Sequence, residues 1–318
     1  MNFLLRGKQS YMSKLIRIGT RESQLAKWQA NQVKDQLLKN GVEAELVYIK
    51  SEGDLDTKTP LYEMGVQGIF TRSLDTALLN NHIDIAVHSM KDVPTQLPQG
   101  IKQAAVLKRG PVNDLLVFNT PLETLYNKEH TAHIATSSIR RKAQWLHSFP
   151  HHQMHNLRGN MNTRLQKLEN ENWDGAIFAQ AGLERIGLRP ENSIELQWML
   201  PAPAQGAIMI VCLENEPFIF ESCQPCNDID TALCTKIERD FLRTLLGGCS
   251  TPISALAIIE NGVLGFNGNI FSLDGSEKVE IEKRVLVKDA SNLGREAAME
   301  LLSNGGRRIA EGVKHAAQ

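Results

Sequence analysis

Over the first two thirds of the chain, short apolar runs alternate with stripes of apolar residues at helical spacing. The apolar runs predict buried strands at residues 15–19, 44–49 and 83–87. Between them, one stripe predicts a helix that Ser23 caps and that ends at Asn40-Gly41, and another predicts a helix over residues 70–80. Strands that alternate with helices favour a parallel or mixed sheet with helices on both faces.

The same alternation begins again after residue 132 and predicts a second α/β unit. Its strands are expected at residues 133–135, 154–157 and 175–179, and its helices at 136–146, 163–171 and 181–186. A further apolar run over residues 208–213 predicts a strand that returns to the first sheet. The two units are similar in architecture, although no repeat is visible in the sequence.

The last third of the chain has a different pattern. Residues 214–227 lack clear periodicity and indicate a linker, whereas a long apolar stripe predicts a helix over residues 230–246. Turn dipeptides at Asn261-Gly262 and Asp274-Gly275 then separate alternating strands, as in β-hairpins. The last helix is expected over residues 292–303, and it ends at the glycines that follow.

Together these patterns predict two α/β domains followed by a small α+β domain. The chain has 318 residues, enough for several hydrophobic cores. The expected boundaries are residues 14–107 with 208–220 for the first domain, 108–207 for the second and 228–318 for the third.

Composition excludes several classes of protein. A formal net charge of −1 argues against a nucleic-acid partner, and no apolar run reaches the roughly 18 residues that span a membrane. Five cysteines, an odd number, do not indicate a disulfide framework and favour the cytoplasm. Residues 1–13 lack the apolar region of a signal peptide, so we expect a mobile extension, with Met12 as an alternative start.

Basic side chains recur just after the predicted strands, where ligands bind in open α/β sheets. Arg140 and Arg141 stand out because cations in the first turn of a helix oppose its dipole. Each basic residue alone is equally compatible with a solvated surface, but arginines gathered at one place match carboxylates and predict a polyanion site. The set consists of Arg21, Lys91, Arg140, Arg141, Arg158, Arg164 and Arg185.

One carboxylate and one thiol lie on the predicted loops. Asp92 follows Lys91 directly, and it is either a turn residue or a carboxylate that stabilises a cation or moves a proton. Cys249 follows a double glycine at the end of a helix. It either fills a turn or presents an accessible thiol to which an acidic ligand is attached.

Two groups of residues, a pair of cysteines and four histidines, are spaced as metal ligands can be, but we do not expect either group to bind a metal. Cys223 and Cys226 form a CxxC pair, but no second pair of cysteines or histidines follows. Four histidines lie close together in the sequence, and a solvated loop or helix face explains them better than a metal site. They are His147, His151, His152 and His155.

Several long motifs occur together and in a fixed order. They are IGTRES (18–23), DIAVHSMKDVP (84–94), TSSIRR (136–141), LRGNMNTRL (157–165), QGA (205–207) and GGC (247–249). In these motifs the chain resembles the porphobilinogen deaminase (hydroxymethylbilane synthase) family. The resemblance extends over about residues 15–306.

The resemblance implies two domains similar in fold to periplasmic binding proteins and a third that carries a cofactor cysteine. It implies a transferase of tetrapyrrole (heme) biosynthesis, cytoplasmic and monomeric, that condenses four porphobilinogen molecules into linear hydroxymethylbilane with loss of ammonia. The implied cofactor is dipyrromethane, held through a thioether at Cys249, and the implied catalytic residue is Asp92. No metal, membrane or nucleic acid is implied.

The resemblance also gives roles to the basic residues, because every pyrrole carries an acetate and a propionate. Loss of ammonia produces an azafulvene whose positive charge is shared by the pyrrole nitrogen, and a nearby carboxylate stabilises it. The implied cofactor-binding residues are Ser23, Lys91, Ser138, Arg140, Arg141 and Arg164. The implied substrate-binding residues are Arg21, Arg158, Arg185 and Phe70.

The chain departs from the family pattern at two positions where lysines are frequent, which are Glu63 and Gln67 here. Smaller departures occur at Ala135 and at Pro203-Ala204. Two other interpretations remain open. A solute-binding protein has a similar two-domain cleft but needs an export signal, and a degenerate paralogue acting as a regulator would account for the lost lysines.

Overall fold

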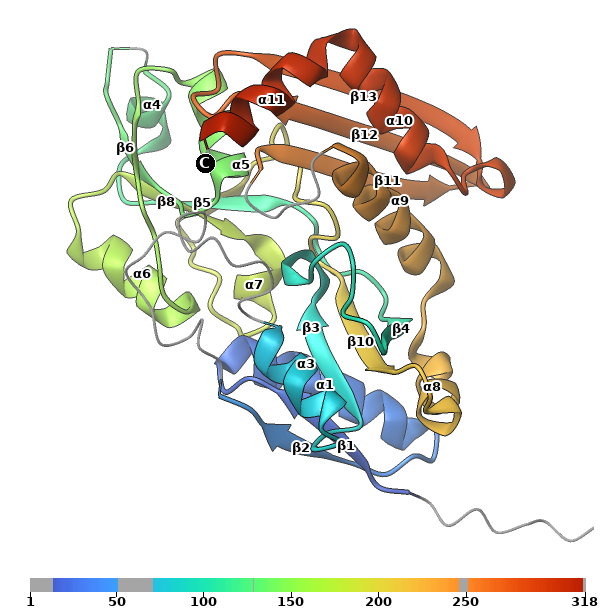
Figure 1. The fold of residues 1–318 in the computed structure, drawn as a ribbon. Coiled ribbons are helices and arrows are strands. Elements are labelled where there is room, and N and C mark those ends of the chain that lie inside the picture. Colours follow the sequence, from blue (N-terminus) through green and yellow to red (C-terminus); the bar gives the residue numbers. More distant parts are fainter. Residues whose placement is uncertain (1–13, 51–70, 128, 246–250, 317–318) are drawn as a thin grey trace, which may run out of the picture.

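The computed structural model describes residues 14–50, 71–127, 129–245 and 251–316, and it contains two five-stranded sheets and one three-stranded sheet. Each sheet carries its own helices, and the three groups are mostly blue to cyan, green, and orange to red in Figure 1. We call them the first, second and third unit in that order. The expected extension at residues 1–13, with Met12, lies outside the described ranges, and so do Glu63, Gln67, Phe70 and Cys249.

The first unit is a mixed sheet with the strand order β2-β1-β3-β10-β4. Its strands are β1 (Ile16–Thr20), β2 (Ala44–Tyr48), β3 (Ile85–Ser89), β4 (Ile101–Val106) and β10 (Ile208–Leu213), and its helices are α1 (Gln24–Lys39), α3 (Arg72–Leu79) and α8 (Pro217–Cys223). β1 runs parallel to β2 and β3, whereas β10 is antiparallel to β3 and β4. The predicted return of residues 208–213 to the first sheet is confirmed.

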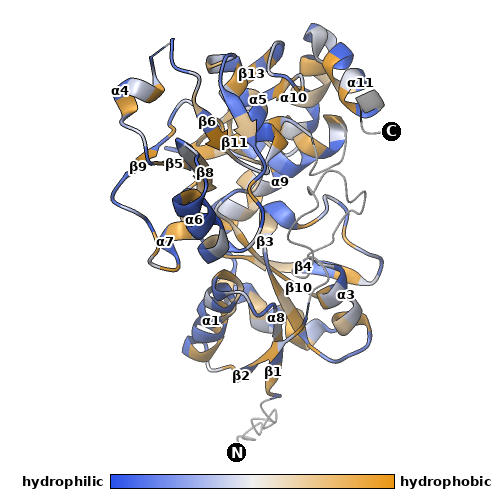
Figure 2. Cartoon of the chain, turned by 90° about the vertical axis from the view of Figure 1, so that its left-hand side faces the viewer, coloured by the Kyte–Doolittle hydropathy of each residue, from blue (hydrophilic) through white to orange (hydrophobic). Residues whose placement is uncertain are grey.

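Local sequence explains why α1 begins and ends where the pattern predicts. The Ser23 hydroxyl accepts a hydrogen bond from the Ala26 N–H at 3.3 Å, which satisfies one of the free donors of the first turn. Gly41 follows the helix with a φ of 77°, a conformation that other residues rarely adopt. Val33 and Leu37 are buried in the core that the strands form, and Figure 2 shows those strands in hydrophobic colours.

The second unit has the strand order β7-β6-β8-β5-β9. Its strands are β5 (Asp114–Phe118), β6 (His133–Ala135), β7 (Gln153–His155), β8 (Gly175–Ala179) and β9 (Ser193–Glu195), and its helices are α4 (Leu122–Leu125), α5 (Ile139–Ser148), α6 (Met161–Asn170) and α7 (Gln180–Glu184). β6 is parallel to β7 and β8, and β5 is antiparallel to β8 and β9. The two five-stranded sheets therefore have the same pattern of strand directions. The strand antiparallel to its neighbours is the last of the first sheet along the chain, β10, and the first of the second sheet, β5.

The chain crosses between these two sheets twice, through residues 107–113 and 196–207. The two crossing segments contact each other, because the Gly110 N–H donates to the Gly206 carbonyl at 3.1 Å. Gly206 has a φ of 85°, and a Cβ there would lie 2.8 Å from the Gly110 carbonyl oxygen. Only glycine allows so close an approach.

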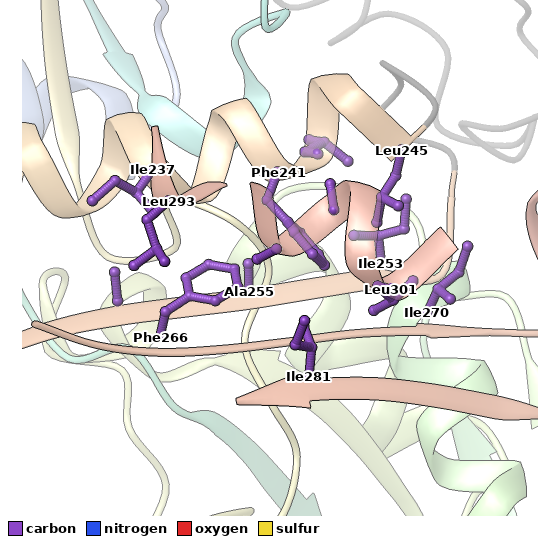
Figure 3. Close-up of a cluster of buried hydrophobic side chains, with 14 of the residues drawn as sticks. Ile237, Phe241, Leu245, Ile253, Ala255, Phe266, Ile270, Ile281, Leu293 and Leu301 are labelled. Carbon is purple, nitrogen blue, oxygen red and sulfur yellow. The ribbon is translucent and has the colours of Figure 1, made fainter. Parts of the chain in front are cut away.

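The third unit packs helices on one face of the antiparallel sheet β11-β12-β13. Its elements are α9 (Ile229–Leu245), β11 (Ile253–Glu260), β12 (Val263–Phe271), β13 (Lys278–Leu286), α10 (Leu293–Leu301) and α11 (Arg307–Ala316). Figure 3 shows Ile237, Phe241 and Leu245 of α9 pointing toward Phe266 and the other apolar side chains of the sheet. The turns at 261–262 and 274–275 lie between the strands, as predicted.

The predicted fold class, two α/β units and a small α+β unit, is confirmed, while several elements were misjudged. The prediction of a linker over residues 214–227 is wrong, because α8 and a 3₁₀ turn, η2 (Gln224–Cys226), lie there. Ile219, Cys223 and Cys226 are buried in the core of the first unit, so the cysteines act as small apolar residues. The domain boundaries given above stay a prediction.

Three strands and, besides α8, two further helices, α4 and α11, were not predicted. β4 and β5 follow each other in a stretch with little alternation, and β9 has only three residues. The helix at 292–303 is not the last, because α11 follows a kink in which Gly305 has a φ of 104°. The glycines after residue 303 interrupt the helix, as predicted. The apolar spacing that follows them, with Ile309 and Val313 buried, was not recognised as a further helix.

Candidate active site

The structure brings five of the predicted basic residues within electrostatic reach of one another. The field of Arg140 and Arg141 acts on Lys91, and that of Arg141 and Arg158 acts on Arg164. The carboxylate of Asp92 acts on both Lys91 and Arg164, which belong to different units. We call this group the cation cluster: Lys91, Arg140, Arg141, Arg158 and Arg164.

A fully buried acid, Asp114, organises two members of the cation cluster. Its Oδ2 accepts from Arg140 Nη2 at 2.7 Å, and its Oδ1 accepts from Arg141 Nη2 at 2.8 Å and Arg141 Nε at 3.0 Å. Burial by itself would raise the pKa of Asp114, but the charges of Arg140 and Arg141 outweigh it and lower the pKa to about 2. One negative charge thus offsets only one of two positive charges.

Arg140 and Arg141 also donate to backbone carbonyls. Arg140 Nη1 donates to Leu200 O at 2.8 Å, and Arg141 Nη1 donates to Ile177 O at 3.1 Å. Ser138 caps α5, since its hydroxyl accepts from the Arg141 N–H at 3.4 Å. The two arginines therefore belong to a fixed, buried scaffold, and their binding of a ligand stays a prediction.

Lys91 is connected to this scaffold through Gln205. Its Nζ donates to Gln205 Oε1 at 3.3 Å, and Gln205 Nε2 donates to Asp114 Oδ1 at 2.9 Å. Burial, reinforced by the charge of Arg141, lowers the pKa of Lys91 to about 8. Lys91 thus remains largely charged at neutral pH, and it is linked through Gln205 to the base of the second unit.

Arg158 lies on the segment between β7 and α6, and Arg164 lies near the start of α6. Asn160 caps α6 by accepting from the Thr163 N–H at 3.0 Å, and Arg164 Nε donates to Gly159 O at 2.8 Å. Burial, together with the charges of Arg141 and Arg158, lowers the pKa of Arg164 to about 10. Several cations share a sparsely hydrated space, which favours the binding of an anion.

Asp92 lies in a 3₁₀ turn, η1 (Met90–Asp92), directly after β3. The strand expected at residues 83–87 ends two residues later than predicted, because His88 and Ser89 still pair with β10. The Asp92 side chain is half-buried, and its unit faces the second unit, which supplies Arg164. A carboxylate among cations, where charged substrate groups would gather, is suited to stabilising a positive charge.

Two protein-family models match this chain. The family model described as "Porphobilinogen deaminase, dipyromethane cofactor binding domain" matches residues 16–221, and the C-terminal domain of porphobilinogen deaminase matches residues 232–303. The chain belongs to the porphobilinogen deaminase family. The sequence-based identification of this family is confirmed.

Relatives match the chain over nearly their whole length. It is 41% identical over 302 residues to the porphobilinogen deaminase of Pelobacter propionicus, covering 94% of this chain and 97% of that protein. It is 39% identical over 307 residues to that of Desulforamulus reducens, covering 95% and 99%. The periplasmic VFT2 domain of Bordetella pertussis BvgS is weakly similar, with 10% identity and a TM-score of 0.41 over 67% of this chain and 86% of that domain.

Membership in the porphobilinogen deaminase family also settles the enzyme class. The chain is a transferase of tetrapyrrole biosynthesis, as predicted, and the matched cofactor-binding domain agrees with the predicted dipyrromethane cofactor. Within the described residues, no helix is long and apolar enough to cross a membrane.

Three other predicted site residues, Arg185, Arg21 and Ser23, have contacts outside the cation cluster. Arg185 Nη2 donates to Gly206 O at 2.6 Å, and its guanidinium lies 5.4 Å from the centre of the Trp28 ring. Burial lowers the pKa of Arg185 to about 10. Arg21 acts electrostatically on His88, and Ser23 caps α1. Phe70 and Cys249 lie outside the described residues.

The cysteines and histidines with metal-like spacing serve packing and hydrogen bonding. Cys223 and Cys226 are buried in the first core, where burial raises the pKa of both thiols. His152 is buried and accepts from Trp145 Nε1 at 3.1 Å, and His147 Nδ1 lies 2.8 Å from Gly275 O. Across the described ranges, no group of three or more His, Cys, Asp or Glu side chains could hold a metal ion.

Sequence reasoning missed Asp114 and Gln205. Asp114 is the one charged residue of the strand DLLVF, and an acid that opens an apolar strand is a signal for a buried partner. Gln205 lies in the QGA motif, but only the structure shows that it connects Lys91 with Asp114.

Proposed function

We propose that this chain condenses four porphobilinogen molecules into linear hydroxymethylbilane and that Asp92 is its catalytic residue. The observation that carries the proposal is the position of Asp92, whose carboxylate acts on Lys91 of its own unit and on Arg164 of the second unit. A substrate held by cations of both units would place its reacting pyrrole beside this carboxylate. A monomeric state and a cytoplasmic location stay predictions.

The cation cluster fits a ligand rich in carboxylates. Each porphobilinogen carries an acetate and a propionate, so each addition brings two negative charges to the site. Arg140 and Arg141 share the single charge of Asp114, which leaves a net positive field to which Lys91, Arg158 and Arg164 contribute. We assign Lys91, Ser138, Arg140, Arg141, Arg164 and Ser23 to the cofactor side, and Arg21, Arg158, Arg185 and Phe70 to the substrate side.

The same donor set fits the dipyrromethane cofactor, whose pyrroles carry the same acids. We assign its attachment to Cys249, four residues beyond the end of α9 in the sequence. When bound, the dipyrromethane supplies the nucleophilic pyrrole carbon to which the first substrate unit is joined. The cations of the cluster hold its carboxylates, with Arg140 and Arg141 acting mainly through the scaffold that Asp114 fixes.

Asp92 acts on the substrate when ammonia leaves. The electron pair of the pyrrole nitrogen assists the departure of ammonia from the aminomethyl carbon, and the pyrrole becomes positively charged. The Asp92 carboxylate stabilises this charge, and because it is held within the folded site it needs little reorganisation. Such a contribution is worth about 3 kcal/mol, which is about a hundredfold in rate.

The test combines intact mass with peptide mapping and a product assay. Protein made with porphobilinogen available should carry a mass increment of two linked pyrroles on the peptide that contains Cys249, and it should form uroporphyrin-type products after oxidation. An increment on Cys212, Cys223, Cys226 or Cys234, or no increment, would contradict the assignment of Cys249. Absence of product from protein that carries the increment would contradict the proposed activity.

A further inference from the structure

The turn that presents Asp92 is short and has few hydrogen bonds of its own. η1 contains only Met90–Asp92. Met90 N–H donates to Ala207 O at 3.0 Å, and Val93 N–H donates back to Met90 O at 3.2 Å. The side chains of Met90 and Val93 are buried in the first unit, whereas Lys91 and Asp92 are half-buried. A single turn of this kind needs further contacts to hold one geometry.

Arg239 supplies those contacts from the third unit. Its Nη1 donates to Val93 O at 2.8 Å and to Met90 O at 3.2 Å, and its Nη2 donates to Pro94 O at 2.6 Å. The three carbonyls flank Asp92 on both sides in the sequence. A guanidinium has several N–H donors in one plane, so a single side chain can join the residues before and after the carboxylate.

The helix that carries Arg239 is itself firmly placed. Its neighbour Glu238 is fully buried and accepts from Arg109 Nη1 at 2.6 Å, from the Ala204 N–H at 2.6 Å and from the Ala257 N–H at 2.8 Å. Glu238 thereby joins α9 to both crossing segments and to β11. Ile237 and Phe241 of the same helix are buried in the third core (Figure 3). Arg239 consequently extends from a rigid support.

We propose that Arg239 is a positioning residue for the reaction: it fixes the turn of Asp92 relative to the third unit. α9 ends at Leu245, four residues before Cys249, so one helix both holds the turn of Asp92 and leads into the segment of the proposed attachment. The inference rests on the proposed catalytic role of Asp92. Arg239 acts through that residue, because its hydrogen bonds go to backbone carbonyls of the turn.

The expected effect is a loss of kcat with KM unchanged, because substrate is held by the cation cluster and not by Arg239. Displacement of a reacting group by about 1 Å can cost about a hundredfold in rate. Arg239→Met should approach that loss, and Arg239→Lys should lose less, since an ammonium keeps some of the hydrogen bonds but cannot span all three carbonyls. The mass increment on the peptide of Cys249 should be retained in both variants.

A matched control is Arg243→Met, four residues further along the same helix. Arg243 is half-exposed and pairs with Asp240 on the same helix, so its removal should leave kcat, KM and the cofactor unchanged. An equal loss of kcat in Arg243→Met would show that any change in the charge of α9 has this effect, and it would overturn the proposal.

The decisive measurement is a double-mutant cycle with Asp92→Asn. If Arg239 acts through the carboxylate, Arg239→Lys should lower kcat in the parent chain but have no further effect in Asp92→Asn. A full loss in both backgrounds, a rise in KM alone, or a kcat equal to that of the parent would overturn the positioning role. Failure of the proposed function is distinguishable, because Asp92→Asn by itself would then turn over normally.

Discussion

The carboxylate of Asp114 and the guanidinium of Arg140 lie 2.7 Å apart, and solvent reaches almost none of either side chain. Arg141 and Gln205 occupy the other carboxylate oxygen. A single buried acid therefore fixes the start of α5, the second crossing segment and, through Gln205, the position of Lys91. The binding site for a polyanion depends on one negative charge at its base.

Asp114→Asn should be strongly destabilising. The amide keeps the shape of the side chain but leaves two buried arginines without a counter-charge, and breaking a buried ion pair in this way costs about 3–5 kcal/mol. The midpoint of urea unfolding should fall accordingly. Asp240→Asn is the control, because Asp240 pairs at the surface of α9, and its loss should change the midpoint little. Equal midpoints for Asp114→Asn and the parent would contradict the structural role of Asp114.

Asp92→Asn should separate catalysis from assembly. The variant should fold and keep the cofactor, yet turnover should fall about a hundredfold because stabilisation of the developing positive charge is lost. Arg140→Leu should instead impair cofactor assembly, since it disturbs the scaffold around Asp114. Mass spectrometry and the product assay on both variants check this. Turnover of Asp92→Asn within a few-fold of the parent would refute its catalytic role.

The sequence predicted those helix ends and turns that depend only on neighbouring residues. The cap at Ser23, the glycine after α1 and the hairpin turn at Asn261-Gly262 depend on neighbours within a few residues, and all three are found. The apolar spacing of Ile237 and Phe241 likewise predicted the buried side of α9. Local chemistry therefore accounts for most of the fold.

What the sequence did not predict depends on contacts between distant segments. Asp114 meets Arg141 across 27 positions, and Arg239 meets Val93 across 146. No local signal in the sequence identifies either partner from the other. The Asp114–Arg141 pair forms only when the second unit folds, and the Arg239–Val93 pair forms only when the first and third units come together. Five of the seven predicted cations form the cation cluster, but the motifs did not predict that Arg140 and Arg141 share a buried acid.

Acid should destabilise the second unit through its histidines. Burial, with the charges of His151 and His130, lowers the pKa of His152 to about 4, and burial lowers the pKa of His155. The unfolded chain takes up these protons near the ordinary pKa of about 6.5. Between pH 6.5 and about 4 the unfolded state binds more protons, so the free energy of unfolding falls as the pH falls.

His152→Asn should weaken this pH dependence. The asparagine oxygen can accept from Trp145 Nε1 as the ring nitrogen does, but it takes up no proton. Urea midpoints at pH 7.5 and pH 5 should therefore differ less in His152→Asn than in the parent. His82→Asn, at an exposed position, should behave as the parent does. The same pH dependence in His152→Asn and the parent would contradict this assignment.

The chain should be an active deaminase although Glu63 and Gln67 stand where lysines are frequent in the family. Lysines there would hold carboxylates or a loop and would take no part in bond making. Gln67 can still donate hydrogen bonds, but without a charge these are about half as strong. Restoring lysine at both positions should therefore change KM modestly and leave the mass increment on Cys249 intact. Uroporphyrin-type products from porphobilinogen, measured after oxidation for both proteins, check this. No product from the parent together with full activity in the double-lysine variant would show a degenerate member of the family.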